Sequence, residues 1–545
     1  MKKLIFAITL GLMASTSLLA QNSKKPKLIV GIVVDQMRAD YLYRFQDNYT
    51  NGGFKRLMGE GFNAKNTHYN YVPTYTGPGH ASVYSGTTPK NHGIVANDWF
   101  SRELNRVIYC AEDSTERLVD NKGVASDKFD YFSRSPRNLL TTNFADELKL
   151  STNSRSKVIG ISLKDRGAIF PAGHMADHAF WYNSKNGNFI SSTYYGDKLP
   201  DWLVKFNKRE VADSLLDLDW EPLLADEKYT HSNPDDSQWE KVYKGKKESA
   251  FPYKLKKLRK ENGDFGMIPE VPYGNTLLAN LAFAAIKGEK LGKGVETDMI
   301  TISFSSTDYV GHNFGIRSKE VEDTYIRLDK DIEALLNYLD KEVGKGEYIL
   351  FLTADHAGSD NPDFLNKEKL PHGYYSTGDI KAGLNEHLSK KFGSKDYVTF
   401  IDGVHVYLDE KAVLENKELV TEAAHFLKNT DGIKEVFVPS IYGNNPEGRL
   451  TTLMSNGYNY ANSGDIIIQF YSGWMSQRTY GTTHGTGFSS DTHVPLLWYG
   501  WNVPKGETSE PHTITQIVPT LSMKLNIPLP DDADLYPIKE LVGNK

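Results

Sequence analysis

The chain has 545 residues, of which 39% are hydrophobic and 24% are charged, and its formal net charge is -6. This composition is that of a soluble globular protein, and the length allows several domains. The negative charge argues against nucleic acid as the main partner, because phosphate backbones select basic surfaces. The single cysteine, Cys110, excludes an internal disulfide, a thiolate zinc cluster and a CxxC redox pair.

The first residues predict an export signal. Residues 1–20 begin with a short basic end, continue as an apolar run and finish in small and apolar residues, which is the layout of a secretory signal peptide. The run is too short, and too polar at its end, to span a membrane stably. We therefore expect a periplasmic or secreted protein without a membrane anchor, whose folded part comprises residues 24–545.

The first predicted strand is the apolar run KLIVGIVV at residues 27–34, which is followed by Asp35. A nearly unbroken run of Val and Ile is typical of a strand buried on both faces of a parallel sheet. A carboxylate at the C-terminal end of such a strand lies where open α/β sheets bind ligands. Capping of the following helix is the alternative role for Asp35.

Residues 71–86, YVPTYTGPGHASVYSG, predict a sharp turn that presents Thr76 near a helix N-terminus. Gly77, Pro78 and Gly79 interrupt regular structure, and the small residues behind them favour a helix. Unpaired backbone N–H groups and the positive end of the helix dipole attract an anion there, commonly a phosphate. Two roles stay open for Thr76, an ordinary helix cap and a nucleophile beside a bound anion.

Several later segments end in polar tips. A loop behind the Thr76 turn returns Asn97 towards the strand ends. The strand-like run at residues 156–170 carries Lys164 and Arg166 at its tip. On an extended tip this spacing points both cations the same way, so that both could reach one phosphoryl group. A pair of solvated loop charges is the alternative. The remaining tips supply Asp308 and His312, Asp355 and His356, and His484.

Helical patterns at residues 274–292 and 318–344 alternate with these strands. Such alternation predicts an α/β protein with a doubly wound, mostly parallel sheet and helices on both faces. Stretches at about 171–267 and 359–462 interrupt the alternation, and we expect them to be insertions packed on the core. The second contains a β-α-β pattern typical of a small subdomain. The apolar run at residues 464–470 is expected to return to the core.

The polar tips together form a candidate metal site. Three carboxylates, three imidazoles and a hydroxyl make a ligand set without thiolate, which suits zinc or a similar divalent ion. Such a set exceeds what one tetrahedral ion needs. Two metal ions about 3.5–4 Å apart would clamp the attacking and leaving oxygens of a phosphoryl displacement. The set comprises Asp35, Thr76, Asp308, His312, Asp355, His356 and His484.

The motifs around these residues resemble those of the alkaline phosphatase superfamily. The resemblance is strongest to its bacterial PafA-type phosphate-irrepressible alkaline phosphatases, whose nucleophile is threonine. It covers the mature chain, and the motifs occur in the family's order. They are VVDQMRADYLYRF, NYVPTYTGPGHAS, GIVANDWF, SLKDRGA, STDYVGHNFG, LTADHAG and GTTHGTG.

The resemblance implies an alkaline-phosphatase-like catalytic domain over residues 24–545 that holds two zinc ions. It makes Thr76 the covalent nucleophile. It implies that one zinc is bound by Asp308, His312 and His484, and the other by Asp35, Asp355, His356 and Thr76. The family's contacts to the phosphoryl oxygens match Asn97, Lys164 and Arg166.

The expected substrates are small phosphate monoesters, and we expect the enzyme to be a monomer. Lys164 and Arg166 favour a monoester dianion, which carries more charge on its phosphoryl oxygens than a diester does. A phosphodiesterase or nucleotide pyrophosphatase of the same superfamily is the nearest alternative. An exported phosphate-binding protein is the alternative without catalysis.

Overall fold

The computed structural model describes residues 25–125, 133–442, 447–476 and 480–543. The expected signal peptide at residues 1–20 lies outside these ranges. Among the described residues, no helix has both the length and the apolar character that crossing a membrane requires.

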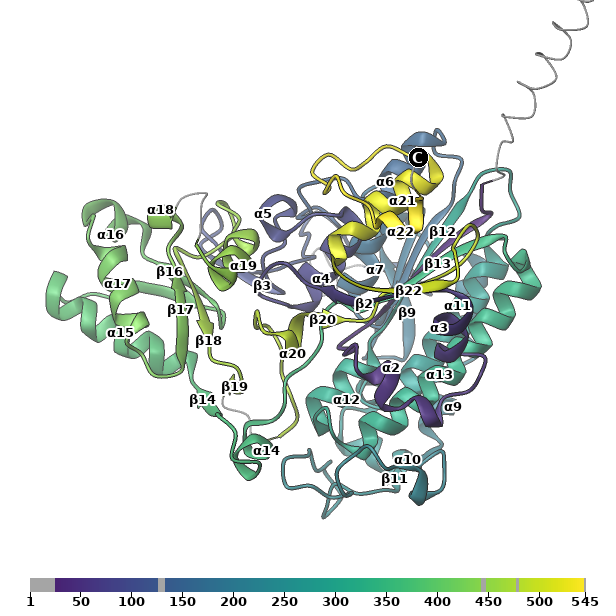
Figure 1. The fold of residues 1–545 in the computed structure, drawn as a ribbon, viewed down its shortest axis with the longest axis horizontal. Helices are drawn as coiled ribbons and strands as arrows, with labels where there is room; N and C mark the ends of the chain where they lie inside the picture. The colour runs from purple at the N-terminus through teal and green to yellow at the C-terminus, as the bar shows by residue number, and fades with distance from the viewer. Residues whose placement is uncertain (1–24, 126–132, 443–446, 477–479, 544–545) are drawn as a thin grey trace, which may run out of the picture.

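A twelve-stranded sheet forms the centre of the molecule, with a run of parallel strands in its middle (Figure 1). These strands lie in the order β13 (Tyr348–Thr353), β1 (Leu28–Val34), β12 (Asp298–Phe304), β7 (Val158–Ser162) and β8 (His178–Asn183). Every residue of β1 is buried, as expected for an apolar strand covered on both faces. The predicted doubly wound, mostly parallel sheet is confirmed.

Antiparallel pairs extend the sheet at both edges. At one edge β21 (Leu497–Gly500) joins β13, and β2 (Phe62–His68) joins β21. At the other edge β9 (Asn188–Ser192) joins β8. Residues 178–192, which we expected within the first insertion, therefore belong to the central sheet. Their sequence did not reveal this, because β8 is rich in aromatic and polar residues and lacks the Val/Ile run of β1.

Helices cover both faces of the sheet (Figure 1). On one face lie α4 (Thr76–Ser85), α7 (Asp165–Ala172) and α21 (Ile517–Leu525), and on the other lie α11 (Tyr273–Gly288) and α13 (Lys319–Leu339). The long helix predicted from its apolar spacing is confirmed in α13. Its buried stripe consists of Val321, Tyr325, Leu328, Ile332, Leu335 and Leu339.

A second, smaller sheet stands beside the core and is drawn in green in Figure 1. Its strands pair antiparallel in the order β15 (Val398–Ile401), β16 (His405–Leu408), β18 (Ile466–Phe470) and β17 (Ile433–Phe437). The expectation that the apolar run at residues 464–470 returns to the core was wrong, because β18 lies between β16 and β17. A central strand of a small sheet is as buried as a core strand, so hydropathy does not distinguish the two.

Candidate active site

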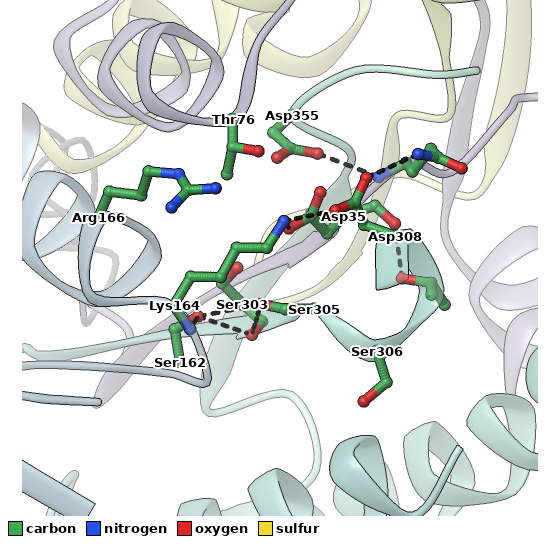
Figure 2. Close-up of polar contacts among 12 residues, drawn as sticks. Asp35, Thr76, Ser162, Lys164, Arg166, Ser303, Ser305, Ser306, Asp308 and Asp355 are labelled. Atoms are coloured by element: carbon green, nitrogen blue, oxygen red, sulfur yellow. Dashed lines mark hydrogen bonds and ion pairs between the residues drawn. The ribbon is translucent and has the colours of Figure 1, made fainter. Parts of the chain in front are cut away.

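Three aspartates meet where the central parallel strands end (Figure 2). Asp35 follows β1, Asp355 follows β13, and Asp308 lies on α12 (Ser306–Phe314), directly behind β12. Since β1 pairs in parallel with β12 and β13, the ends of these strands lie side by side. Asp35 and Asp355 are fully buried, and Asp308 is 3% exposed. The sheet topology therefore brings three buried carboxylates together.

Three imidazoles present the same nitrogen to these carboxylates. Each ring donates its Nδ1–H to a backbone carbonyl: His312 to Thr482 at 2.8 Å, His356 to Ala357 at 2.9 Å and His484 to Thr74 at 2.7 Å. When the ring is neutral, Nε2 therefore keeps its lone pair, and this is the nitrogen that can bind a metal ion. Burial lowers the pKa of His484 to about 3 and also lowers that of His356, so both rings are neutral at neutral pH.

The ligand atoms gather in two groups that share His356. Its Nε2 lies 3.5 Å from Asp35 Oδ1 and 3.5 Å from Asp355 Oδ2. In the other group, the rings of His356 and His484 stack with their centroids 3.4 Å apart. Asp308 Oδ1 lies 3.8 Å from His484 Nε2 and 3.1 Å from the Nε2 of His312 one helical turn away. The predicted carboxylate and imidazole ligands thus form one compact cluster.

This cluster leaves buried polar atoms without hydrogen-bond partners. Within the described part of the chain they include Asp35 Oδ1, Asp355 Oδ2 and His356 Nε2. An unsatisfied buried polar atom costs about 1–3 kcal/mol, and when the carboxylates are ionised these atoms are all acceptors, which cannot satisfy one another. A cation placed between them would satisfy them all. Oxygen and imidazole donors without sulfur fit zinc or a similar divalent ion.

Lys164 supplies one positive charge to the cluster. Its Nζ lies 2.6 Å from Asp35 Oδ2 and 2.6 Å from Asp308 Oδ2 (Figure 2). Burial raises the pKa of Asp35 to about 6, and the neighbouring Asp308 adds to this effect while Lys164 opposes it. Burial also acts to raise the pKa of Asp308, but His312 and Lys164 outweigh it and hold this pKa well below its usual range. A single ammonium leaves the three carboxylates with an excess of negative charge.

Thr76 is the first residue of α4 and faces this cluster (Figure 2). It is only 2% exposed. Gly79 allows the helix to pack directly on the strand end, because a Cβ at this position would lie 2.3 Å from the carbonyl oxygen of Asp355. His80 donates its Nδ1–H to the Thr76 carbonyl at 2.8 Å. The hydroxyl of Thr76 is therefore carried by a helix end that is fixed against the carboxylate cluster.

The donors at this helix end differ from those expected. The Gly77 N–H donates to Asn97 Oδ1 at 2.8 Å, and Pro78 has no N–H. Few backbone donors are thus left for an anion. Asn97 has its amide oxygen held by this bond, while its Nδ2 finds no partner among the residues described. The side-chain amide of Asn97 is therefore a candidate donor next to this helix end.

Lys164 and Arg166 lie at the start of a helix, so the expected extended tip was wrong. Lys164 is the N-cap of α7, and Arg166 is in its first turn. Asp165 between them begins the helix, where the helix dipole favours an acidic residue. The two long side chains still converge: Figure 2 shows Arg166 pointing towards Thr76 and Lys164 towards Asp35.

Gln36 connects two of the carboxylates, although it was not among the predicted site residues. Its backbone N–H donates to Asp355 Oδ1 at 3.2 Å, and its side-chain Nε2 donates to Asp308 Oδ1 at 2.6 Å. Its backbone is left-handed, with φ at 62°, which is uncommon for a residue other than glycine. Gly311 leaves room for the side chain, because a Cβ there would lie 2.0 Å from Gln36 Oε1. The only available signal was its position after Asp35.

Two tyrosines beside the cations were also missed. Tyr109 accepts a hydrogen bond from Arg166 Nη1 at 2.9 Å, and the centroid of the Tyr309 ring lies 5.1 Å from Lys164 Nζ. With 31 tyrosines in the chain, residue type alone could not select these two.

Three comparisons place the chain among known proteins. The profile of the type I phosphodiesterase / nucleotide pyrophosphatase family matches residues 29–497. The alkaline phosphatase PafA of Elizabethkingia meningoseptica is 42% identical over 534 residues, covering 95% of both chains. A Myroides odoratus protein named calcium-transporting ATPase is 42% identical over 542 residues, covering 96% of both. The crystal structure of wild-type PafA matches with a TM-score of 0.90 at 41% identity, covering 95% of this chain and 99% of that one.

Proposed function

Since the chain belongs to the type I phosphodiesterase / nucleotide pyrophosphatase family and is an alkaline phosphatase, we propose that it hydrolyses phosphate monoesters through a covalent phosphothreonine at Thr76. One observation carries the proposal. A buried threonine hydroxyl, a cluster of carboxylates and imidazoles, and the cations Lys164 and Arg166 converge at the carboxyl ends of the central strands. Figure 2 shows the threonine, the three carboxylates and the two cations of this site. The convergence provides a nucleophile, a metal-binding ligand set and a binding site for a dianion.

The cluster holds two zinc ions in this proposal. The ligands of one are Asp308, His312 and His484, and those of the other are Asp35, Asp355, His356 and Thr76. Bound there, the metal ions supply Lewis-acid activation of the nucleophile and neutralise charge on the leaving oxygen. The unpartnered acceptors of the cluster and its neutral, Nε2-presenting imidazoles support this assignment.

The chain's own residues carry out the displacement. Thr76 Oγ1 gives up its proton and attacks phosphorus in line with the leaving oxygen, so the bond to that oxygen breaks as the bond to threonine forms. The departing alkoxide takes up a proton and leaves as the alcohol. Lys164, Arg166 and the Nδ2 of Asn97 contact the equatorial oxygens, where charge is concentrated. Water then attacks the phosphothreonine and releases inorganic phosphate. His80 keeps Thr76 in place through its bond to the threonine carbonyl.

Export and a monomeric state complete the proposal. The charge and hydropathy layout of residues 1–20 supports export to the periplasm or the medium.

The first test compares the zinc-loaded mature protein on an aryl phosphate monoester and on the matching methyl phosphate diester. Hydrogen bonds to charged groups contribute about 1.5–3 kcal/mol each. If the diester lacks the two hydrogen bonds that Lys164 and Arg166 make to the monoester dianion, kcat/KM should favour the monoester by a factor on the order of 10² or more. A preference for the diester would indicate a phosphodiesterase instead. Phosphate binding without turnover of either ester would indicate a binding protein.

The Myroides odoratus relative is named a calcium-transporting ATPase, so the same assay is repeated with ATP as the substrate, with and without calcium. We expect phosphate release from ATP to be the same with and without calcium, because no calcium-coupled step belongs to the proposed mechanism. A strict calcium requirement would contradict the mechanism proposed for this chain.

Replacing Gln36 with asparagine is expected to weaken zinc binding by about 10–100-fold. Asparagine tolerates the left-handed backbone, but its shorter amide does not reach Asp308, so the carboxylate loses its orienting donor. Zinc affinity is measured by competition with a chelator. Gln46→Asn is the control, because Gln46 is exposed. Equal zinc affinity in the Gln36 variant and the wild type would show that Gln36 does not orient the ligands.

A further inference from the structure

The hydroxyl of Tyr109 links Arg166 to a carboxylate. Arg166 Nη1 donates to Tyr109 Oη at 2.9 Å, and Tyr109 Oη donates to Asp165 Oδ1. A phenol has one proton to donate, a guanidinium only donates, and a carboxylate only accepts. The direction of both hydrogen bonds is therefore determined. Replacing the hydroxyl breaks both of them.

The carboxylate at the end of this link is itself fixed. Arg134 Nε donates to Asp165 Oδ2 at 2.7 Å, and Arg134 is only 4% exposed. The guanidinium carbon of Arg134 also lies 4.5 Å from the centroid of the Tyr109 ring, within the range of a cation–π contact. Arg134 thus contacts both the carboxylate that accepts the hydrogen bond of the tyrosine hydroxyl and the face of the tyrosine ring.

A short hairpin connects this network to Asn97. Tyr109 ends β4 (Arg106–Tyr109), which pairs with β3 (Asp98–Ser101). Asn97 directly precedes β3, and the N–H of Cys110 donates to the Asn97 carbonyl at 2.8 Å. The proposed phosphoryl contacts Asn97 and Arg166 are therefore both hydrogen-bonded to residues at the base of this hairpin.

The network persists at alkaline pH. Burial raises the pKa of Tyr109 well above its usual range, and Asp165 adds to the effect while Arg166 opposes it. The hydroxyl consequently keeps its proton over the alkaline range, and it continues to accept from Arg166 and to donate to Asp165.

We infer that Tyr109 is a positioning residue whose hydroxyl orients the Arg166 guanidinium towards the phosphoryl group at Thr76. The inference rests on the proposed function, in which Arg166 contacts phosphoryl oxygens. Without the hydroxyl, Arg166 keeps its charge but loses one of the contacts that fix its rotamer. Pre-organised contacts contribute more to the transition state than mobile ones. We expect kcat/KM to fall mainly for monoesters, because their dianionic phosphoryl group is stabilised by a second cation.

The test is Tyr109→Phe, which removes only the hydroxyl. We expect kcat/KM for the aryl monoester to fall about tenfold, the effect of one hydrogen bond to a charged group. Turnover of the methyl diester should change by less than about twofold, and inhibition by inorganic phosphate should weaken by about the same factor as monoester turnover. A merely structural role would lower both activities equally.

A double-mutant cycle with Arg166→Ala isolates the coupling. If Tyr109 acts through Arg166, adding Tyr109→Phe to Arg166→Ala produces no further loss. Tyr182→Phe is the matched control, because it removes a tyrosine hydroxyl that donates to Phe265 O at 3.0 Å outside the site, and it should leave the monoester to diester ratio unchanged. Additive losses, or equal losses on both esters, would overturn the role of Tyr109. An Arg166→Ala variant that kept the wild-type preference for the monoester, by losing turnover of both esters equally, would instead contradict the proposed role of Arg166.

Discussion

Replacing Thr76 with alanine is expected to abolish phosphoenzyme formation and to lower monoester kcat/KM by a factor on the order of 10³ or more, as removal of a covalent nucleophile does. The Thr76 hydroxyl lies at a helix end packed against Asp355 through Gly79, in a position that is 2% exposed. Water entering in its place would lack this fixed position and would have to attack the substrate directly. Rapid quench with a radiolabelled monoester, followed by phosphoamino acid analysis, measures the covalent intermediate.

Metal binding provides the control for this variant. The carboxylate and imidazole ligands remain after Thr76→Ala, so we expect most of the zinc content to be retained. Thr76→Ser restores a hydroxyl on the same helix end and should regain most of the turnover and the covalent intermediate, now as phosphoserine. A burst of product in Thr76→Ala as large as that of the wild type would rule out Thr76 as the nucleophile.

The core of the fold could be predicted because the spacing of its apolar residues clearly distinguishes buried strands from amphipathic helices. The strand β1 is an unbroken apolar run, and α13 repeats its apolar residues at helical spacing. The placement of Asp35 and Asp355 could be predicted from these strands, since the carboxyl ends of neighbouring parallel strands lie side by side. In this region, local pattern and global topology agree.

Three segments were misplaced because the local hydrophobic pattern does not determine where they pack. The strand β8 is buried but aromatic, and β18 is apolar but belongs to the small sheet. Lys164 and Arg166 were assigned to an extended tip, whereas a helix begins between them. In each case contacts with distant parts of the chain determine the secondary structure or the sheet to which the segment belongs. The local sequence indicates such contacts only weakly.

The positioning residues escaped sequence reasoning for a different reason. Gln36 acts through a left-handed backbone and an amide that reaches Asp308. Tyr109 acts through a hydroxyl that meets Arg166 only in the folded chain. Neither role requires a recognisable motif. Ligands and nucleophiles have distinctive chemistry, while the groups that orient them are ordinary residues in particular places.

Removal of the metal ions is expected to abolish turnover and to make protein stability fall as pH rises from about 4 to 6. Burial raises the pKa of Asp35 from 3.8 to about 6, so the metal-free folded protein binds this proton more tightly than the unfolded chain does. The resulting stabilisation is complete below pH 3.8 and is lost as pH rises through 6, on the order of 3 kcal/mol. Asp355, whose pKa burial also raises, acts in the same direction. The lowered pKa of Asp308 affects stability only below this window.

Zinc should reverse this loss, because a divalent ion stabilises the ionised carboxylates. A free concentration 1,000 times the dissociation constant adds about 4 kcal/mol to the free energy of unfolding. Denaturant unfolding of chelator-treated and zinc-loaded protein at pH 4.5 and 7.5 measures both effects. In Asp35→Asn the side chain at position 35 is uncharged at both pH values. The metal-free variant should therefore lose less stability between pH 4.5 and 7.5 than the metal-free wild type loses. If the metal-free wild type were equally stable at both pH values, the buried carboxylates would not carry the unbalanced charge that we assign to metal binding.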